Sequence, residues 1–282
     1  MQYTEDDLKL LKKHILLIVS EVKRVCDEEH IPYFIIGGTA LGAVRHSGFI
    51  PWDDDFDIGM LRDDYERFLE VAPLKLSKFY FLQCYKTDPN TPFYFAKVRM
   101  NDTLFVEKYC GKISMHQGIY IDIFPYDNLP ITLAERKKQL RKVILYSELF
   151  IAKSTLGLFF AEKKNLRFWT KKLLRTVLHY MLVPISKKCL FEILDRENRR
   201  YNSFDTSEVS YIKYPFLKIK KEYVVIQSSI LFEGISVSCC RNIEEYLISH
   251  FGNDYMELPP LEKRVNHRPV KLKFLYNISD GE

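Results

Sequence analysis

Four aspartates fall within five residues, from Asp53 to Asp57, and this is the densest group of chemically capable side chains in the sequence. Asp55 and Asp57 are two residues apart, so on an extended segment both carboxylates point to one side while Phe56 and Ile58 point into the core. Like charges side by side repel unless a cation lies between them, and paired carboxylates that face phosphates bind Mg²⁺. The spacing therefore predicts a divalent-metal site, for Mg²⁺ or Mn²⁺, at Asp55 and Asp57 with Asp53 as a further candidate ligand.

A pair of glycines, Gly37-Gly38, follows a short apolar run and precedes a segment compatible with a helix. Two glycines after a strand let the backbone come close to an anion, and a helix N-terminus offers unpaired N–H groups and a partial positive charge. We expect Gly37, Gly38 and Thr39 to cradle a phosphate or a pyrophosphate. A phosphate cradle near a metal-binding pair of acids indicates phosphoryl or nucleotidyl transfer.

Either motif alone has a simpler explanation, because most glycine pairs are turns and many Asp-x-Asp sequences are loop caps or solvated acids. The acids, however, are bounded by Trp52 on one side and by Ile58-Gly59-Met60 on the other. A solvated acidic face should not be embedded between apolar residues, so the combination favours a functional site. Asp54 is expected either to orient the metal ligands or to be a ligand itself.

A further acid lies in the stretch from Gly118 to Phe124, which alternates as a strand. Alternation places Asp122 with Tyr120 on one face and isoleucines on the other. A lone carboxylate flanked by isoleucines is costly to bury, which favours a role for Asp122 as metal ligand or as base for an incoming hydroxyl. The alternative is a structural acid that caps a turn. Asp127, just before Asn128, is expected to be a turn residue.

Several basic side chains are candidates for neutralising phosphate charge. Lys97 and Arg99 share one face of the strand predicted from Phe93 to Met100, where two cations could complement donor phosphates. Arg45 lies in the helix-compatible segment after the glycines, and His267 could hydrogen-bond a phosphate. The simpler alternatives are a solvated strand face for the two strand cations and a structural role for His267.

The run GTALGAVRHSGFIPWDDDFDIGM at residues 38–60 resembles the signature of the LicD family, whose relatives include fukutin and fukutin-related protein in the nucleotidyltransferase-fold superfamily. Further similar segments lie at 97–99, 118–125 and 255–267, and the resemblance is weakest from about 133 to 202. In such folds a third carboxylate from a later strand meets the first pair, which suits Asp122.

The resemblance implies a metal-dependent transferase that takes a phospho-alcohol from a CDP-activated donor, typically CDP-choline. The phospho-alcohol would be placed on a sugar hydroxyl of a surface glycan, such as lipopolysaccharide, teichoic acid or capsule, with release of CMP. The residues alone equally allow a nucleotidyltransferase that attacks an NTP and releases pyrophosphate. A third alternative is a non-catalytic protein that binds a glycan or lipid through a degenerate site.

The chain has 282 residues, which is long enough for one large or two small domains. Its net charge of +5 suits anionic ligands but is too small to indicate nucleic-acid binding. The charged N-terminus lacks a signal-peptide pattern, and no window of about 18 residues is free of charge, so no transmembrane helix is expected. Six scattered cysteines without a CxxC pair read as reduced thiols. We therefore expect a cytoplasmic protein.

The patterns predict an α/β (or α+β) fold in which a small mixed sheet carries the acids and helices cover it. Three parts are expected: a nucleotidyltransferase-like core at 1–132, a basic helical insertion at 133–202, and a part at 203–282 that completes the core. Among the local elements we expect a helix at 4–30 with a capping box, a helix from Arg62 that Pro73 stops, and a strand at 223–226.

The helical pattern at 163–200 is rich in lysine and arginine, with apolar and aromatic residues interleaved. A basic amphipathic helix can lie on an anionic membrane, which would place the protein at the inner face of the membrane beside a lipid-linked glycan acceptor. The alternative is a helical subdomain with a solvated basic face, and the sequence does not decide between the two.

Overall fold

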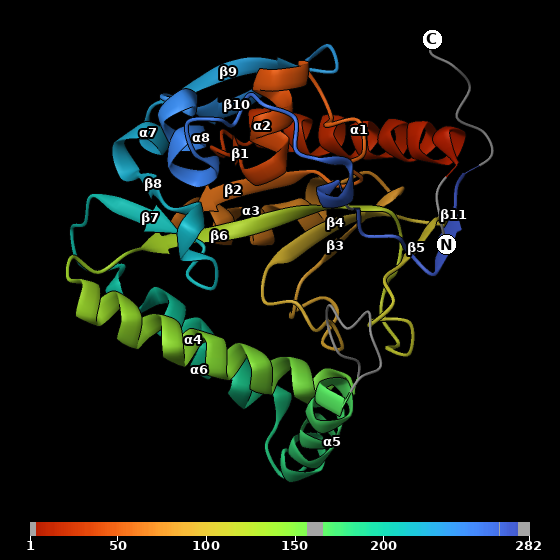
Figure 1. The fold of residues 1–282 in the computed structure, drawn as a ribbon, viewed down its shortest axis with the longest axis vertical. Coiled ribbons are helices and arrows are strands. Elements are labelled where there is room, and N and C mark those ends of the chain that lie inside the picture. The colour runs from red at the N-terminus through yellow and green to blue at the C-terminus, as the bar shows by residue number, and fades with distance from the viewer. Residues whose placement is uncertain (1–3, 157–165, 265, 276–282) are drawn as a thin grey trace.

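A mixed β-sheet lies at the centre of the computed structural model, which describes residues 4–156, 166–264 and 266–275 (Figure 1). Its main path runs through β1 (Phe34–Ile35), β2 (Asp57–Leu61), β6 (Tyr120–Asn128), β4 (Ala96–Met100) and β3 (Tyr80–Gln83). β2 and β6 are parallel, whereas the other neighbours on this path are antiparallel. The mixed sheet and its covering helices confirm the predicted α+β class.

Two helices, α1 (Glu5–Glu28) and α3 (Arg62–Lys75), pack on one face of this sheet. α1 begins with the predicted capping box, in which Thr4 and Asp7 exchange side-chain and backbone hydrogen bonds. The prediction that Pro73 stops α3 is wrong, because the helix continues to Lys75. A proline in the last turn removes only one late hydrogen bond, and the Leu76 N–H still donates to the Ala72 carbonyl at 2.9 Å.

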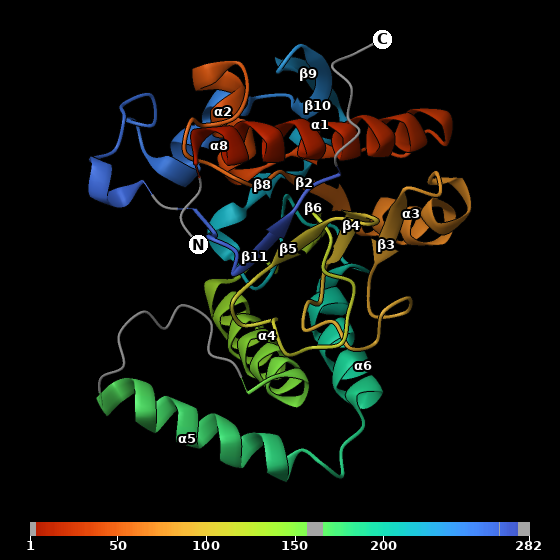
Figure 2. The ribbon, with the colours of Figure 1, turned by 90° about the vertical axis from the view of Figure 1, so that its right-hand side faces the viewer.

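Three helices lie on the opposite side of the sheet, in the lower part of Figure 1. They are α4 (Leu133–Ser154), α5 (Leu166–Met181) and α6 (Lys187–Asn198). α4 packs against both α6 and α5, and α5 is the outermost of the three (Figure 2). The helical content of the predicted insertion is therefore confirmed, while the boundaries at 132 and 202 stay predictions.

The C-terminal part adds smaller elements around the sheet. β7 (Glu208–Ser210) pairs with the end of β6 and with β8 (Ile219–Lys220), while β9 (Gln227–Phe232) and β10 (Ile235–Cys240) form a hairpin. α7 (Lys221–Val225) occupies the segment predicted as a strand at 223–226. That prediction is wrong because burial of Val224 and contacts with β8 and β10 override the β-preference of the local sequence.

The remaining elements connect these parts. They are α2 (Gly37–His46), β5 (Leu104–Val106), α8 (Ile243–Phe251), β11 (Lys271–Lys273), and short 3₁₀ helices at Arg199–Tyr201, Pro215–Leu217 and Leu261–Lys263. β11 pairs with β5, so the end of the chain returns to the sheet region. No helix in the described ranges combines the length and the apolar character that crossing a bilayer requires.

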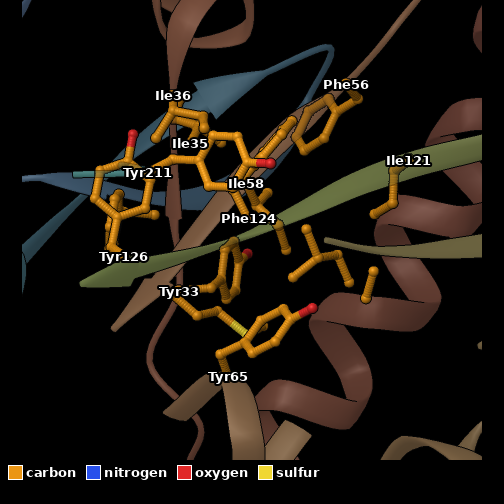
Figure 3. Close-up of a cluster of buried hydrophobic side chains, with 14 of the residues drawn as sticks. Tyr33, Ile35, Ile36, Phe56, Ile58, Tyr65, Ile121, Phe124, Tyr126 and Tyr211 are labelled. Atoms are coloured by element: carbon orange, nitrogen blue, oxygen red, sulfur yellow. The ribbon is translucent and has the colours of Figure 1, made fainter. Parts of the chain in front are cut away.

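Alternation along the central strands separates the core from the opposite face. Ile119, Ile121 and Ile123 are almost completely buried, and Ile121 packs in the hydrophobic cluster with Ile58 and Phe56 (Figure 3). Tyr120, Asp122 and Phe124 instead line a cavity. The predicted two-sided character of this strand is therefore confirmed, and it determines which side chains are available for chemistry.

Candidate active site

A cavity of about 730 Å³ lies between the sheet and the α4–α6 layer. From the sheet side its walls include Asp55, Asp57, Lys97, Tyr120, Asp122 and Phe124. From the helical side they include Glu148, Phe150, Lys171, Leu174, Arg175 and Leu178. Asp55, Asp57 and Asp122 therefore face a partly open cavity whose other walls are largely aromatic and aliphatic.

The parallel pairing of β2 and β6 brings the acids together. Asp57 lies directly opposite Asp122 in register, and Asp55 lies two residues before Asp57 on the same wall. Burial, followed by the charges of Asp55 and Asp122, raises the pKa of Asp57 well above its usual value. Burial also raises the pKa of Asp122 to about 6, although Lys97 opposes the shift. These pKa values are raised because the carboxylates are buried and lie close together with little positive charge to compensate them.

Asp53 belongs to the same group of acids. Burial and the charges of Asp55 and Asp54 raise the pKa of Asp53 to about 8. The N-terminus of α2 lies beside it, because a Cβ atom added to Gly38 would be 2.9 Å from the Asp53 Oδ2 atom. A glycine at this position lets the helix approach the carboxylate.

Lys97 is paired with Asp122 rather than free. Its Nζ atom lies 2.7 Å from the Asp122 Oδ1 atom, and the two residues are opposite each other in the β4–β6 register. The same ammonium group lies 3.5 Å from the centre of the Tyr120 ring and 4.3 Å from that of Phe93. Lys97 therefore neutralises one acid within an aromatic environment, and its predicted contact with a donor phosphate stays a prediction.

The chemistry of the acids fits a hard divalent cation. In the described part of the chain, no three acidic, histidine or cysteine side chains are already arranged so that they could hold a metal ion. Asp53, Asp55, Asp57 and Asp122 nevertheless supply the oxygen donors that Mg²⁺ and Mn²⁺ prefer, and a cation would stabilise the crowded charges that raise their pKa values. Metal binding would require small side-chain movements, including a change in the Lys97–Asp122 pair.

The residues predicted as a phosphate cradle support the acidic strand. The Gly37 N–H donates to the Tyr246 hydroxyl at 2.8 Å, and the Thr39 hydroxyl accepts from the Asp57 N–H at 2.9 Å. The residues that line the cavity do not include Gly37, Gly38 or Thr39 in the described chain. Thr39 therefore holds the backbone of Asp57 and Gly37 contacts Tyr246, and the phosphate cradle itself stays a prediction.

His267 reaches the site from the far end of the chain because β11 pairs with β5. Its Nδ1 atom lies 2.9 Å from the Asp54 Oδ1 atom and 3.8 Å from the Asp55 Oδ2 atom. Burial would lower the pKa of His267, but the Asp54 hydrogen bond and the charge of Asp55 raise it well above the usual value. The imidazolium therefore holds Asp54 in place, and a direct contact with phosphate stays a prediction.

The part of the chain that contains the acid cluster matches a known protein family. Residues 30–149 match the family described as "LicD/FKTN/FKRP, nucleotidyltransferase domain". The chain carries a LicD-family domain. The matched residues include Asp53, Asp55, Asp57 and Asp122, so the family match covers the acid cluster, and the resemblance noted in the sequence is confirmed.

The similarity extends beyond this LicD domain. The chain is 26% identical over 262 residues to the lipopolysaccharide cholinephosphotransferase LicD of Haemophilus influenzae, covering 89% of this chain and 92% of that protein. Uncharacterised proteins of Rickettsia typhi and Rickettsia prowazekii are 41% and 39% identical over 56 residues, about 20% of this chain. The first of these similarities therefore reaches both the α4–α6 layer and the C-terminal part.

Two predicted phosphate ligands lie away from the cavity of the LicD domain. Arg45 donates to the carbonyls of Tyr255 and Glu257, at 2.9 Å each, near the C-terminal end of α2. Arg99 is fully buried and donates to the side chain of Gln83 and to the Gly118 carbonyl. Their positions give them structural contacts, so a phosphate contact by either stays a prediction that the geometry does not favour.

Sequence reasoning missed several cavity residues. They are Glu107, Tyr109, Lys171, Arg175 and Lys213. The spacing of Lys171 and Arg175, four residues apart in a helical pattern, could have indicated a shared face. No local signal distinguishes Glu107 or Lys213 from other exposed charges, because only the folded chain brings them to the cavity.

Proposed function

We propose that this protein transfers phosphocholine from CDP-choline to a sugar hydroxyl of a surface glycan of the lipopolysaccharide type, with release of CMP. The observation that carries the proposal is the group formed by Asp55, Asp57 and Asp122 on the wall of a partly open, largely aromatic cavity. Similarity to a lipopolysaccharide cholinephosphotransferase over 89% of the chain supports the choice of reaction.

The composition of the cavity supports a cationic alcohol. Glu107 lines the cavity but is only 5% exposed, and it accepts a hydrogen bond from the Tyr109 hydroxyl. Tyr120 and Phe93 already surround one cation, the Lys97 ammonium. Aromatic faces together with a carboxylate bind quaternary ammonium groups, so the trimethylammonium of choline is proposed to lie beside Glu107 and Tyr120.

Basic side chains on the cavity wall support an anionic donor. Lys171, Arg175 and Lys213 come from the helical layer and the C-terminal part, and Lys97 comes from the sheet. Arg175 and Lys213 both lie near Glu148, at 3.3 and 3.9 Å. These groups would stabilise the diphosphate of the donor.

In the proposed reaction the acceptor hydroxyl oxygen bonds to the phosphorus distal to cytidine, and the bond from that phosphorus to the bridging oxygen breaks. CMP leaves with the electron pair, and the hydroxyl proton passes to a carboxylate, for which Asp122 is the candidate. Asp55 and Asp57, with Asp122 and Asp53 as further ligands, would hold Mg²⁺ or Mn²⁺. The bound ion would supply charge stabilisation for the phosphoryl oxygens.

A comparison of two donors tests this proposal. Purified protein with Mg²⁺ is incubated with CDP-choline or CDP-glycerol, and CMP release is measured for the wild type and for Glu107→Gln. We expect CDP-choline to be preferred, and Glu107→Gln to raise its KM about tenfold while leaving CDP-glycerol little affected. The exposed Glu70→Gln variant serves as the control and should match the wild type.

The outcomes separate the reaction from the alcohol. CMP release from CDP-choline with no effect of Glu107→Gln would contradict the position of the ammonium group only. Absence of CMP release from any CDP-alcohol, together with pyrophosphate release from CTP or ATP, would favour the nucleotidyltransferase alternative. Absence of both activities would favour a non-catalytic protein that binds a glycan or lipid.

A further inference from the structure

The outer face of α5 is an exposed apolar surface. Trp169, Leu173, Val177 and Tyr180 follow one another at helical spacing, and all four are exposed, with Leu173 at 67% and Tyr180 at 65%. We call these four residues the α5 stripe. An amphipathic helix in a folded protein normally turns such a face inward, so the stripe requires a partner of its own.

Polar contacts on the opposite face fix this orientation. Arg175 is buried and donates to the Thr155 carbonyl and to Glu148, and the His179 Nδ1 atom lies 2.7 Å from the Ala152 carbonyl oxygen. All three partners lie in the second half of α4 or at its C-cap, Thr155, so α5 contacts α4 through Arg175 and His179. The stripe lies on the exposed side of α5, and α5 itself lies at the outer edge of the molecule (Figure 2).

The charge of the surrounding sequence identifies the kind of partner. Residues 163–191 contain eight lysines and arginines and no aspartate or glutamate. The rest of the chain has 34 basic against 37 acidic residues, so it carries a net charge of −3 within a total of +5. Lys172, one residue before Leu173, is exposed, and so is Lys188 near the start of α6, whereas Lys171 lines the cavity. A second copy of the same surface would bring these cations against each other.

We infer that α5 docks on the surface of an anionic lipid membrane. The stripe would enter the interface between headgroups and acyl chains, while the flanking lysines contact anionic headgroups. Tryptophan and tyrosine, present here at Trp169 and Tyr180, are enriched at that depth in membranes. A helix with one exposed apolar face and basic residues around it is more stable on an anionic membrane surface than in water.

Docking through α5 would also place the cavity beside the membrane. Leu174, Leu178 and Lys171 line the cavity from α5, so the helix that carries the stripe is also one wall of the site. An acceptor glycan attached to a lipid could then approach the cavity along the membrane surface. The inference on docking stands on α5 alone and does not depend on the proposed reaction.

Vesicle flotation of the full-length protein tests the inference. We expect binding to phosphatidylcholine vesicles that contain about 30% phosphatidylglycerol, weak binding to pure phosphatidylcholine, and loss of binding in high salt. The double variant Leu173→Glu/Val177→Glu should bind the anionic vesicles at least about tenfold more weakly. Leu74→Glu is the matched control, because Leu74 is 84% exposed on α3 and far from α5 in sequence.

Thermal melting of each variant confirms that the fold is retained before binding is compared. Three results would overturn the inference: no binding of the wild type to anionic vesicles, equal binding to both kinds of vesicle, or equal binding of the double variant and the wild type. A wild-type dimer that the double variant dissociates in size-exclusion chromatography would also overturn it, because a second copy would then cover the stripe.

Discussion

Asp57 combines a fixed backbone with a crowded charge. Thr39 holds its N–H, Asp122 lies opposite it in register, and Asp55 lies on the same wall. A carboxylate in such surroundings is unfavourable in the absence of a cation, since burial and its acidic neighbours both raise its pKa. The position of Asp57 is therefore suited to binding a cation and does not help to stabilise the fold when no cation is bound.

The substitution Asp57→Asn keeps the shape of this side chain and removes its charge. We expect kcat for CMP release to fall about thousandfold, because one ligand of the divalent ion is lost. The melting temperature of the metal-free protein should stay the same or rise, because one of several repelling charges is gone. Exposed Asp63→Asn is the control. Activity near that of the wild type would contradict the metal assignment.

The position of Asp122 could be predicted from the sequence, whereas that of Asp127 could not. Asp122 was predicted to be functional because isoleucines flank it, and alternation placed it correctly on the cavity side. The prediction that Asp127 is a turn residue is wrong: it is buried in β6 and pairs with Arg62. That pairing joins residues 65 positions apart, which no local pattern reveals.

At the scale of elements, the Arg62–Asp127 pair fixes the start of α3 against the end of β6. Asp127 also accepts a hydrogen bond from the Asn202 side chain at 2.6 Å, which joins the segment after α6 to the sheet. Arg62 is 7% exposed and Asp127 is completely buried. The contact therefore connects three elements through charges that are shielded from water.

Removing one partner should be costly. We expect Asp127→Ala to lower the free energy of unfolding by about 3 kcal/mol, because it leaves the Arg62 charge buried with less compensation. Glu192→Ala breaks an exposed pair with Lys188 and should cost less than about 0.5 kcal/mol. Urea unfolding of both variants measures the difference. Similar small losses for the two would show that the buried pair contributes little.

Element boundaries were predictable where local patterns are strong. The α1 cap follows from the short signal of Thr4 and Asp7, and the structure confirms it. α7 was misread because valine and tyrosine favour strands, whereas tertiary packing made this segment a helix. The orientation of α5 was not predictable either, because it depends on long-range contacts of Arg175 and His179 with α4 and its C-cap.

At the scale of the whole molecule, stability depends on charges at the junction of sheet and helices. Metal-free, the acid cluster holds protons that the unfolded chain would release: the pKa is about 8 for Asp53 and about 6 for Asp122, against about 3.9 for an unfolded aspartate. Between about pH 4 and pH 8 the folded state binds more protons, so the free energy of unfolding falls as pH rises. The raised pKa of His267 acts in the same direction above about pH 6.5.

Melting temperatures in EDTA should therefore decrease from pH 5 to pH 8, and the slope should be shallower for Asp53→Asn. Added Mg²⁺ should restore stability most strongly at pH 8, where the carboxylates are ionised. Differential scanning fluorimetry at matched ionic strength measures both effects. A melting temperature that is constant or rises over this range without metal would contradict the description of the acid cluster.

The cavity forms only when the whole chain is folded, and it could not be predicted from the sequence. Its sheet wall comes from predicted residues, but its other walls come from α4, α5 and the segment around Lys213, which contain none of the predicted site residues. Long-range packing of two layers creates the space, and no local pattern encodes its volume or its aromatic lining.

The most direct test of the central claim is phosphorus NMR of the purified protein with CDP-choline and Mg²⁺. The acid cluster is proposed to direct attack at the phosphorus distal to cytidine. We therefore predict that the diphosphate resonances of the donor are replaced by those of CMP and of a phosphodiester, or of phosphocholine where water is the acceptor. Chelation with EDTA should stop the change. A donor that remains intact beside CTP or ATP that is converted with release of pyrophosphate would contradict the account.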